Sequence, residues 1–161
     1  MAVDMFLKLD GIKGESRDAK HKDEIDIESF SWGESQFASA GSSGGGGAGK
    51  VSMQDFHFVM RISKASPQLF LHCANGEHIK EGLITLRKAG KEQLEYLKYT
   101  FTDVMITSFQ TGGAAGGLDV PMDSISLNFA KIEIEYTEQQ PDGTPGATYK
   151  AGWDVKANTK I

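Results

Sequence analysis

Apolar and polar residues alternate along residues 122–138, and the alternation changes phase partway. The apolar residues occupy odd positions from Ile125 to Phe129 and even positions from Ile132 to Tyr136. Because successive side chains of a strand point to opposite faces, these residues reach one core only if the strand bends or takes an extra residue near Ala130 and Lys131. About seventeen residues at roughly 3.3 Å each span roughly 50 Å, which is long for a straight strand. The pattern therefore predicts a bent strand that serves two sheets or a barrel.

Two other stretches carry the same change of phase. Along residues 24–32 it falls between Ile27 and Phe30, and along residues 51–62 it falls near Gln54 and Asp55. Three long strands with corners predict a mainly β protein, a closed or nearly closed barrel of two packed sheets. The alternative is that some of these apolar residues face a neighbouring molecule outside the barrel.

One helix is predicted over residues 66–76. Ser66 suits the N-cap and Pro67 the first helical position, and Gly76 follows as a stop signal. Leu69, Phe70 and Cys73 are expected to share one face, so the helix should plug an end or side of the barrel.

The remaining strands follow from alternation between turn signals. Residues 1–10 alternate, with Phe6 as an apolar residue on the outer face, and residues 11–23 are expected to form a surface loop. Further strands are predicted over residues 82–89, 93–101, 104–110 and 149–155, and Thr102 and Asp103 are expected to separate the middle two.

Composition narrows the choice of function. The 161 residues (17.5 kDa) fit one domain spanning 1–161. A net charge of −5 argues against a nucleic-acid or anionic-membrane partner. A single cysteine, Cys73, excludes an internal disulfide and a cysteine-based zinc cage. The first nine residues lack the pattern of a signal peptide, and no run of eighteen apolar residues occurs, so we expect folding in the cytoplasm and no membrane span.

Residues 35–50 form a long glycine-rich segment that includes a near-match to a phosphate-binding loop. Residues 44–50 read GGGGAGK, but Val51 stands where such loops carry Ser or Thr. The residues that follow alternate like a strand, whereas a phosphate cradle needs a helix N-terminus. We therefore expect no nucleotide cofactor.

The histidines and Cys73 do not form a recognisable reactive site in the sequence. His72 is next to Cys73, and adjacent helical residues point about 100° apart, so it cannot serve Cys73 as a base. His57 or His78 could approach Cys73 in space, but a small core-facing thiol is the more ordinary role. A zinc site built from His72, Cys73 and His78 lacks a fourth ligand in the sequence.

Acidic residues line two predicted strands, at Glu24, Asp26 and Glu28 and again at Glu133 and Glu135. Such stripes are typical of solvated faces that protect sheets from misplaced pairing. The aromatic residues fall on the opposite faces, which disfavours a glycosidase cleft. We therefore expect no catalytic, cofactor or metal site, and the two long glycine loops favour packing against another copy.

Six segments, spread in order over nearly the whole chain, resemble the haemolysin-coregulated protein (Hcp) family. They are MAVDMFLKLDGIKGES at residues 1–16, SWG at 31–33, SPQL at 66–69, RKAG at 87–90, NFA at 128–130 and GWD at 152–154. The resemblance implies a phage tail-tube-like fold and a tube protein of the bacterial type VI secretion system. Six copies would form a ring, and rings would stack head to tail into an injected tube.

The resemblance also implies partners and site residues. Ser31 corresponds to the family's lumen-facing serine, and Ser29 lies on the same polar face, so both are expected to contact effector proteins carried in the lumen. Phe30 departs from the family, in which a second Trp is common. The extended loop is expected to reach the neighbouring ring through the following residues: Gly44, Gly45, Gly46, Gly47, Gly49 and Lys50. A spike protein and a contractile sheath complete the expected partners, and the tube would leave the cell by injection.

Two alternatives from other classes stay open at this point. One is a monomeric β-barrel hydrolase that uses Cys73 or a carboxylate pair. The other is a carbohydrate-binding module, for which Phe6 and Tyr99 are the candidate platform residues.

Overall fold

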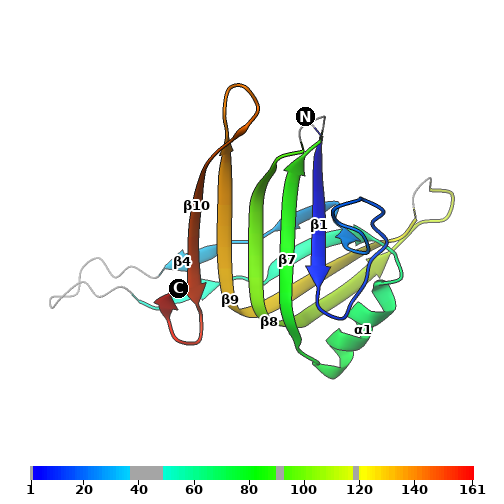
Figure 1. Cartoon of the computed structure of the whole chain (residues 1–161). Helices are drawn as coiled ribbons and strands as arrows, with labels where there is room; N and C mark the ends of the chain where they lie inside the picture. Colours follow the sequence, from blue (N-terminus) through cyan, green and yellow to red (C-terminus); the bar gives the residue numbers. More distant parts are fainter. Residues whose placement is uncertain (1, 37–48, 90–92, 118–119) are drawn as a thin grey trace.

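The computed structural model describes residues 2–36, 49–89, 93–117 and 120–161, and Figure 1 shows the arrangement of its strands and helix. The elements in chain order are β1 (Val3–Leu9), β2 (Ile25–Asp26), β3 (Ser29–Ser31), β4 (Glu34–Gln36), β5 (Val51–Met53), β6 (Phe56–Arg61), α1 (Ser66–Asn75), β7 (Ile79–Lys88), β8 (Glu95–Gly112), β9 (Met122–Gln139), β10 (Pro145–Asp154) and β11 (Thr159–Lys160).

Nine of the strands in the described residues form one antiparallel sheet that folds over on itself. Its main path runs β11-β10-β9-β8-β7-β1-β2, while β6 pairs with the first half of β9 and carries β3 on its other side. The outer layer contains β10, β7, β1 and the adjoining halves of β8 and β9. The inner layer contains β3, β6 and the other halves of β8 and β9. The two long strands therefore run through both layers and join them (Figure 1).

The predicted bend in β9 is confirmed. Phe129 and Ile132 are both buried, at 5% and 3% exposed, although they have opposite parity, and Ala130 and Lys131 between them are part-exposed. Before the bend β9 pairs with β6, and after it β9 pairs with β10. The change of phase in the sequence thus marks the point where the strand passes from one layer to the other.

At the other two predicted corners the chain breaks into separate strands. Residues 24–32 divide into β2 and β3, and residues 51–62 divide into β5 and β6 at Gln54 and Asp55. The prediction of two separate strands around Thr102 and Asp103 is wrong, because β8 continues through them. Asp103 adopts a φ of 56°, so one residue in the left-handed region absorbs the bend within the strand.

The helix α1 lies against β8 and covers one side of the space between the layers. Leu69 is fully buried and Cys73 packs partly against the core, as expected. Phe70 is rotated about 100° from Leu69 around the helix axis and is 57% exposed, so its predicted place on the buried face is met only in part: its ring packs on Phe109 of β8, with centroids 6.0 Å apart. The N-cap is Ala65 instead of Ser66, whose hydroxyl donates a hydrogen bond to Asp123 Oδ2 at 2.5 Å.

The fold class, mainly β with one short helix, is confirmed, but the sheet does not close into a barrel. The strands at the two ends of the main path, β2 and β11, have two residues each and pair with no strand beyond them in the described part of the chain. A core of aliphatic and aromatic side chains, including Phe56, Phe58 and Phe101, fills the space between the layers. No helix in the described residues has the length and apolar character needed to cross a membrane.

Candidate functional site: a polar face on the inner layer

The outward face of the inner layer is lined by small polar side chains. Alternate residues of β3, β6, β8 and β9 point away from the core, while their neighbours, such as Phe58 and Ile125, are fully buried. Eight of these outward residues are called here the seryl face: Ser29, Ser31, His57, Val59, Ser108, Gln110, Ser124 and Ser126. A further row of the same face contains Arg61, Met122 and Gly112.

The strand register arranges the seryl face in two rows of four residues. Directly paired residues of antiparallel strands share a face and lie close together. One row runs Ser31, His57, Ser126, Ser108, and the other runs Ser29, Val59, Ser124, Gln110. The structure therefore places Ser29 and Ser31 together, at the β3 edge of one polar surface.

The seryl face is held by local hydrogen bonds and carries little charge. His57 Nδ1 lies 3.2 Å from Ser126 Oγ, which ties β6 to β9 within one row. Beyond that row, Asp55 accepts hydrogen bonds from Thr107 Oγ1 (2.7 Å) and Asn128 Nδ2 (2.9 Å). Such a surface presents hydroxyl and amide groups that both donate and accept hydrogen bonds. It can bind polar protein surfaces without selecting one sign of charge.

The sequence pattern identified two of these residues and missed the others. The polar positions of β9, Ser124 and Ser126, were visible as the off-phase residues of the bent strand. They could have been assigned to the face of Ser31 only with the pairing of β3, β6 and β9, which the sequence does not specify.

The predicted ring-stacking residues Gly44, Gly45, Gly46 and Gly47 lie outside the described residues. Gly49 and Lys50 are described and exposed, and Val51 opens β5. Lys50 thus leads into a strand and not into a helix, as the alternation of the following residues predicted.

The histidines are engaged with groups other than Cys73. His72 Nδ1 lies 2.8 Å from the carbonyl oxygen of Gln68, and His78 Nδ1 lies 2.6 Å from Asp103 Oδ1. The hydrogen bond from His78 lowers the pKa of Asp103. Among the described residues no group of three or more His, Cys, Asp or Glu side chains could hold a metal ion.

Several carboxylates of the acidic stripes pair with basic groups. Glu28 pairs with Arg61 at 3.1 Å, and Glu133 pairs with Lys150 at 3.1 Å. Desolvation, followed by the nearby charges of Asp4, Glu28 and Asp18, raises the pKa of Asp26. These carboxylates do not converge on a cleft lined by aromatic side chains.

The two candidate residues of a carbohydrate platform pack against other side chains of the same chain. Phe6 is 4% exposed and stacks on His21 with ring centroids 4.4 Å apart. Tyr99 packs against Phe30 and Phe56, and burial raises the pKa of its hydroxyl. Neither ring offers the exposed surface that stacking on a sugar requires.

Comparison with known proteins agrees with the resemblance seen in the sequence. Residues 6–136 match the family described as type VI secretion system effector, Hcp. Protein hcp1 of Pseudomonas aeruginosa is 44% identical over 162 aligned residues that cover 99% of each chain. The crystal structure of Hcp1 from Salmonella typhimurium is 39% identical with a TM-score of 0.81 and full coverage of both chains. A solved structure described as a type six secretion system protein has a TM-score of 0.94 at 29% identity, and it covers 99% of this chain and 100% of its own.

These relatives decide between the classes of function left open by the sequence. Hcp proteins are structural tube proteins of the type VI secretion system, they are secreted by it, and they are not enzymes. The comparisons do not support a monomeric hydrolase or a carbohydrate-binding module. Self-assembly into tubes follows from the family, and the match extends over the whole chain. The chain belongs to the Hcp family of type VI secretion proteins.

Proposed function

We propose that six copies of this chain form a ring whose channel is lined by the seryl face, and that stacked rings form the injected tube. The observation that carries the proposal is the pair of open edges on the inner layer. Among the described residues, β3 pairs with β6 alone, and β8 beyond Val104 pairs with β9 alone. An open edge presents unpaired backbone N–H and C=O groups, and closing strands into a ring removes such edges.

Ring closure through these edges places the seryl face on one continuous surface. The inner layers of neighbouring copies would join β3 to β8, so the two rows of each copy would continue around the ring. Small hydroxyl side chains keep such a channel wide, and their weak individual hydrogen bonds allow a carried protein to be released. We propose that Ser29 and Ser31 contact effector proteins there.

The remaining partners rest on the family resemblance. The glycine-rich loop, including Gly44 to Gly47, Gly49 and Lys50, is proposed to contact the next ring. A spike protein is proposed to cap the tube and a contractile sheath to surround it. The chain is proposed to fold in the cytoplasm and to leave by injection.

The ring is tested by measuring the mass and shape of the purified protein. We expect light scattering on a sizing column to give six times the chain mass, and negative-stain images of the same peak to show rings with an open centre. A compact monomer at all concentrations would overturn the proposal.

The role of the seryl face is tested with Ser31→Gln. The longer side chain projects into the proposed channel, so rings should form normally while one or more small proteins disappear from the culture supernatant. Quantitative mass spectrometry of supernatants checks this, and export of the tube protein itself should be unchanged. Ser52→Gln, at an exposed serine of β5 outside the seryl face, is the matched control. Normal export of every protein by Ser31→Gln would contradict a channel role.

The role of the glycine-rich loop is tested by deleting residues 44–49. We expect rings of normal mass that no longer stack into tubes in vitro, seen by electron microscopy. Tube formation at the wild-type level would exclude these residues from stacking.

A further inference from the structure

The helix α1 carries apolar side chains on two faces, and the second stays largely exposed, although the Phe70 ring makes a T-shaped contact with Phe109 of β8 at 6.0 Å between centroids. Its inner face is buried through Leu69. Its outer face has four exposed apolar residues at the spacing i, i+3, i+4, i+7, called here the α1 stripe: Pro67, Phe70, Leu71 and Ala74. Phe70 is 57% exposed and Leu71 is 47% exposed. A surface helix ordinarily places polar residues on its outer face, so the α1 stripe indicates a docking surface.

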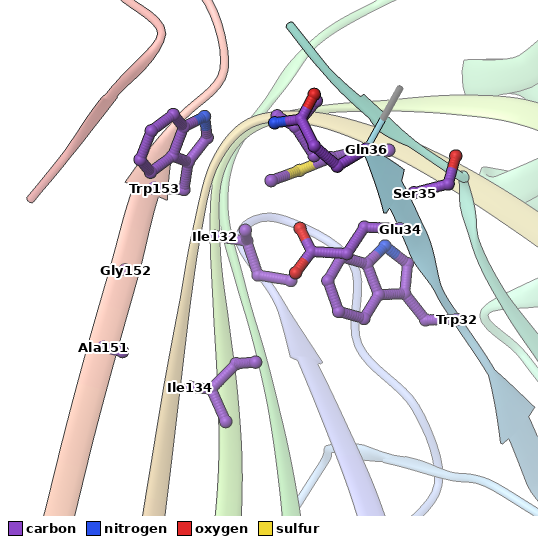
Figure 2. A pocket seen from close by; sticks show the side chains of 11 residues that line it. Trp32, Glu34, Ser35, Gln36, Ile132, Ile134, Ala151, Gly152 and Trp153 are labelled. Carbon is purple, nitrogen blue, oxygen red and sulfur yellow. The ribbon is translucent and has the colours of Figure 1, made fainter. Parts of the chain in front are cut away.

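The opposite side of the molecule has an open apolar groove of about 510 Å³. It lies between the β4–β5 ribbon and strands β9 and β10, and it is called here the tryptophan groove. Ile132, Ile134 and Ala151 form its floor, and Trp32 and Trp153 stand at its sides (Figure 2). A volume of this size lies in the ordinary range for a binding site.

The groove exists because the inward face of the outer layer extends beyond the inner layer. One row of paired residues runs from Leu7 and Ile84, which are fully buried, through Tyr99 to Ile134 and the exposed Ala151. The parallel row ends at Tyr136 and Tyr149, which are 46% and 59% exposed. The sequence therefore places core-type residues where the described residues leave them exposed.

The α1 stripe and the tryptophan groove lie on opposite sides of one subunit. Figure 1 shows α1 below β7 and β1, and β4 and β10 at the other end of the sheet. Among the described residues, α1 covers the space between the layers on the first side, and the β4–β5 ribbon covers it on the second. Two different apolar surfaces on opposite sides are what a head-to-tail contact between identical subunits requires.

We infer that the α1 stripe of one subunit docks into the tryptophan groove of its neighbour in the ring. The contact is a helix in an apolar groove, anchored by residues at helical spacing. The inference rests on the proposed ring. It adds a second contact between neighbouring subunits to the pairing of their β3 and β8 edges. A second copy is the favoured occupant because both apolar surfaces occur on a chain of a self-assembling family, and permanent interfaces are the more apolar ones.

Charge at the two surfaces is complementary. The Glu34 carboxylate lies over the groove beside Trp32 and Ile132 (Figure 2). Lys64 is exposed two residues before α1 begins. A Lys64 to Glu34 pair at the edge of the contact would orient the helix and would contribute little to its strength.

The test uses one variant on each surface, Phe70→Glu and Ala151→Glu. Both positions are exposed, so the fold should survive, which circular dichroism checks. Each variant alone should lose rings, because every subunit needs both surfaces to continue a ring. An equimolar mixture retains one intact stripe and one intact groove, so it should give a one-to-one dimer by native mass spectrometry and no ring. Gln68→Glu, at an exposed position of α1 outside the stripe, is the control and should keep its rings.

Tryptophan fluorescence gives an independent readout. The chain has two tryptophans, and both line the groove. Docking of the α1 stripe should bury them, so wild-type emission should shift to shorter wavelength as rings assemble with rising concentration. Phe70→Glu should show no shift.

The outcomes separate this inference from the proposed function. If the wild type forms rings and both Glu variants form them equally well, the helix-in-groove contact is wrong and the ring stands. If those rings form but fail to assemble a sheath, the α1 stripe binds another component, which also overturns the inference. A wild type that stays monomeric overturns the ring together with the contact.

Discussion

The loop of residues 10–24 and the helix α1 both cover part of the folded sheet. They differ in whether their outward side chains have contacts within the same chain. The loop lies over the outer layer and completes a charged cluster within one chain. Arg87 is 3% exposed, and its guanidinium donates hydrogen bonds to Asp4 and Asp18 and lies 4.9 Å from the Phe6 ring centroid. The helix instead presents apolar residues that stay largely exposed in the described chain, although the Phe70 ring contacts Phe109.

In the loop region, His21 has a hydrogen-bond partner at each of its two ring nitrogens. Its Nδ1 lies 2.7 Å from Glu24 Oε2, and its Nε2 lies 2.7 Å from Glu95 Oε1. Both ring nitrogens thus have a carboxylate oxygen within hydrogen-bonding distance, and the second of these contacts ties the loop to β8. The hydrogen bond from His21, with the charge of Lys98, lowers the pKa of Glu95 against the opposing effect of its desolvation.

The difference between the two regions predicts which property a mutation changes, the stability of the subunit or the assembly of the ring. A region completed within one chain contributes to the stability of the subunit. A region left open should contribute to assembly while leaving the subunit intact. Substitutions in the loop cluster should therefore change unfolding, and substitutions in the α1 stripe or the tryptophan groove should change the ring.

Among substitutions in the loop cluster, the largest effect on unfolding is expected for Arg87→Met. The variant leaves Asp4 and Asp18 without their cation next to a buried site, so the free energy of unfolding should fall by about 2–4 kcal/mol. Urea denaturation at fixed protein concentration measures it. Arg61→Met, which removes an exposed pair with Glu28, is the control and should cost about 0–1 kcal/mol. Equal losses in the free energy of unfolding would show that the buried Arg87 cluster contributes no more than the exposed pair of Arg61 and Glu28.

A second substitution, Gly14→Ala, tests the path of the loop. A Cβ at Gly14 would lie 2.4 Å from the carbonyl oxygen of Glu24, which is backbone and cannot move aside. We expect a loss of about 1–3 kcal/mol in the free energy of unfolding. Gly11 has a φ of 81° and open space around it, so Gly11→Ala should cost only the backbone strain of about 1–2 kcal/mol. A Gly14→Ala protein as stable as the wild type would mean that the loop takes another path.

The sequence predicted the layers well because alternation reports which face of a strand is buried. The change of phase in β9 identified the passage between layers from Phe129 and Ile132 alone. Alternation does not say whether a corner is made by a bend, as in β9, or by a break, as at Gln54. It also missed Asp103, where a non-glycine residue in the left-handed region keeps β8 continuous.

The candidate site was harder to predict because it depends on which strands pair with one another and in which register. Ser31 and Ser108 are far apart in the chain and share a row only through β6 and β9. The loop cluster was missed for the same reason: residues 11–23 have the composition of a surface loop. Only the structure shows that His21 reaches Glu95.

Acid should weaken the loop cluster through Asp18. The hydrogen bond from Arg87 is the largest cause that lowers the Asp18 pKa, from 3.8 to about 2. A carboxylate with a lowered pKa adds stability above its unfolded value and loses that contribution as the pH falls through the folded value. The wild type should therefore lose stability relative to Asp18→Asn between about pH 4 and about pH 2. Urea midpoints of both proteins at pH 7, 4 and 3 measure the difference, and a constant difference would exclude the Arg87 contact as its source.

The smallest effect on unfolding is expected on the seryl face, for Ser108→Gln. Ser108 is exposed at the β8 end of the row that begins with Ser31, so the longer side chain should change the free energy of unfolding by no more than about 0.5 kcal/mol. The comparison variant is Phe58→Ala. Phe58 follows His57 on β6 but points into the core and is fully buried, so its truncation should cost about 3–5 kcal/mol. If the row lines the channel, Ser108→Gln should nevertheless reduce export of the same proteins as Ser31→Gln, because ring closure brings the β8 edge of one subunit beside the β3 edge of the next. Loss of export with Ser31→Gln but not with Ser108→Gln would confine the contact to the β3 edge and would argue against a continuous lining.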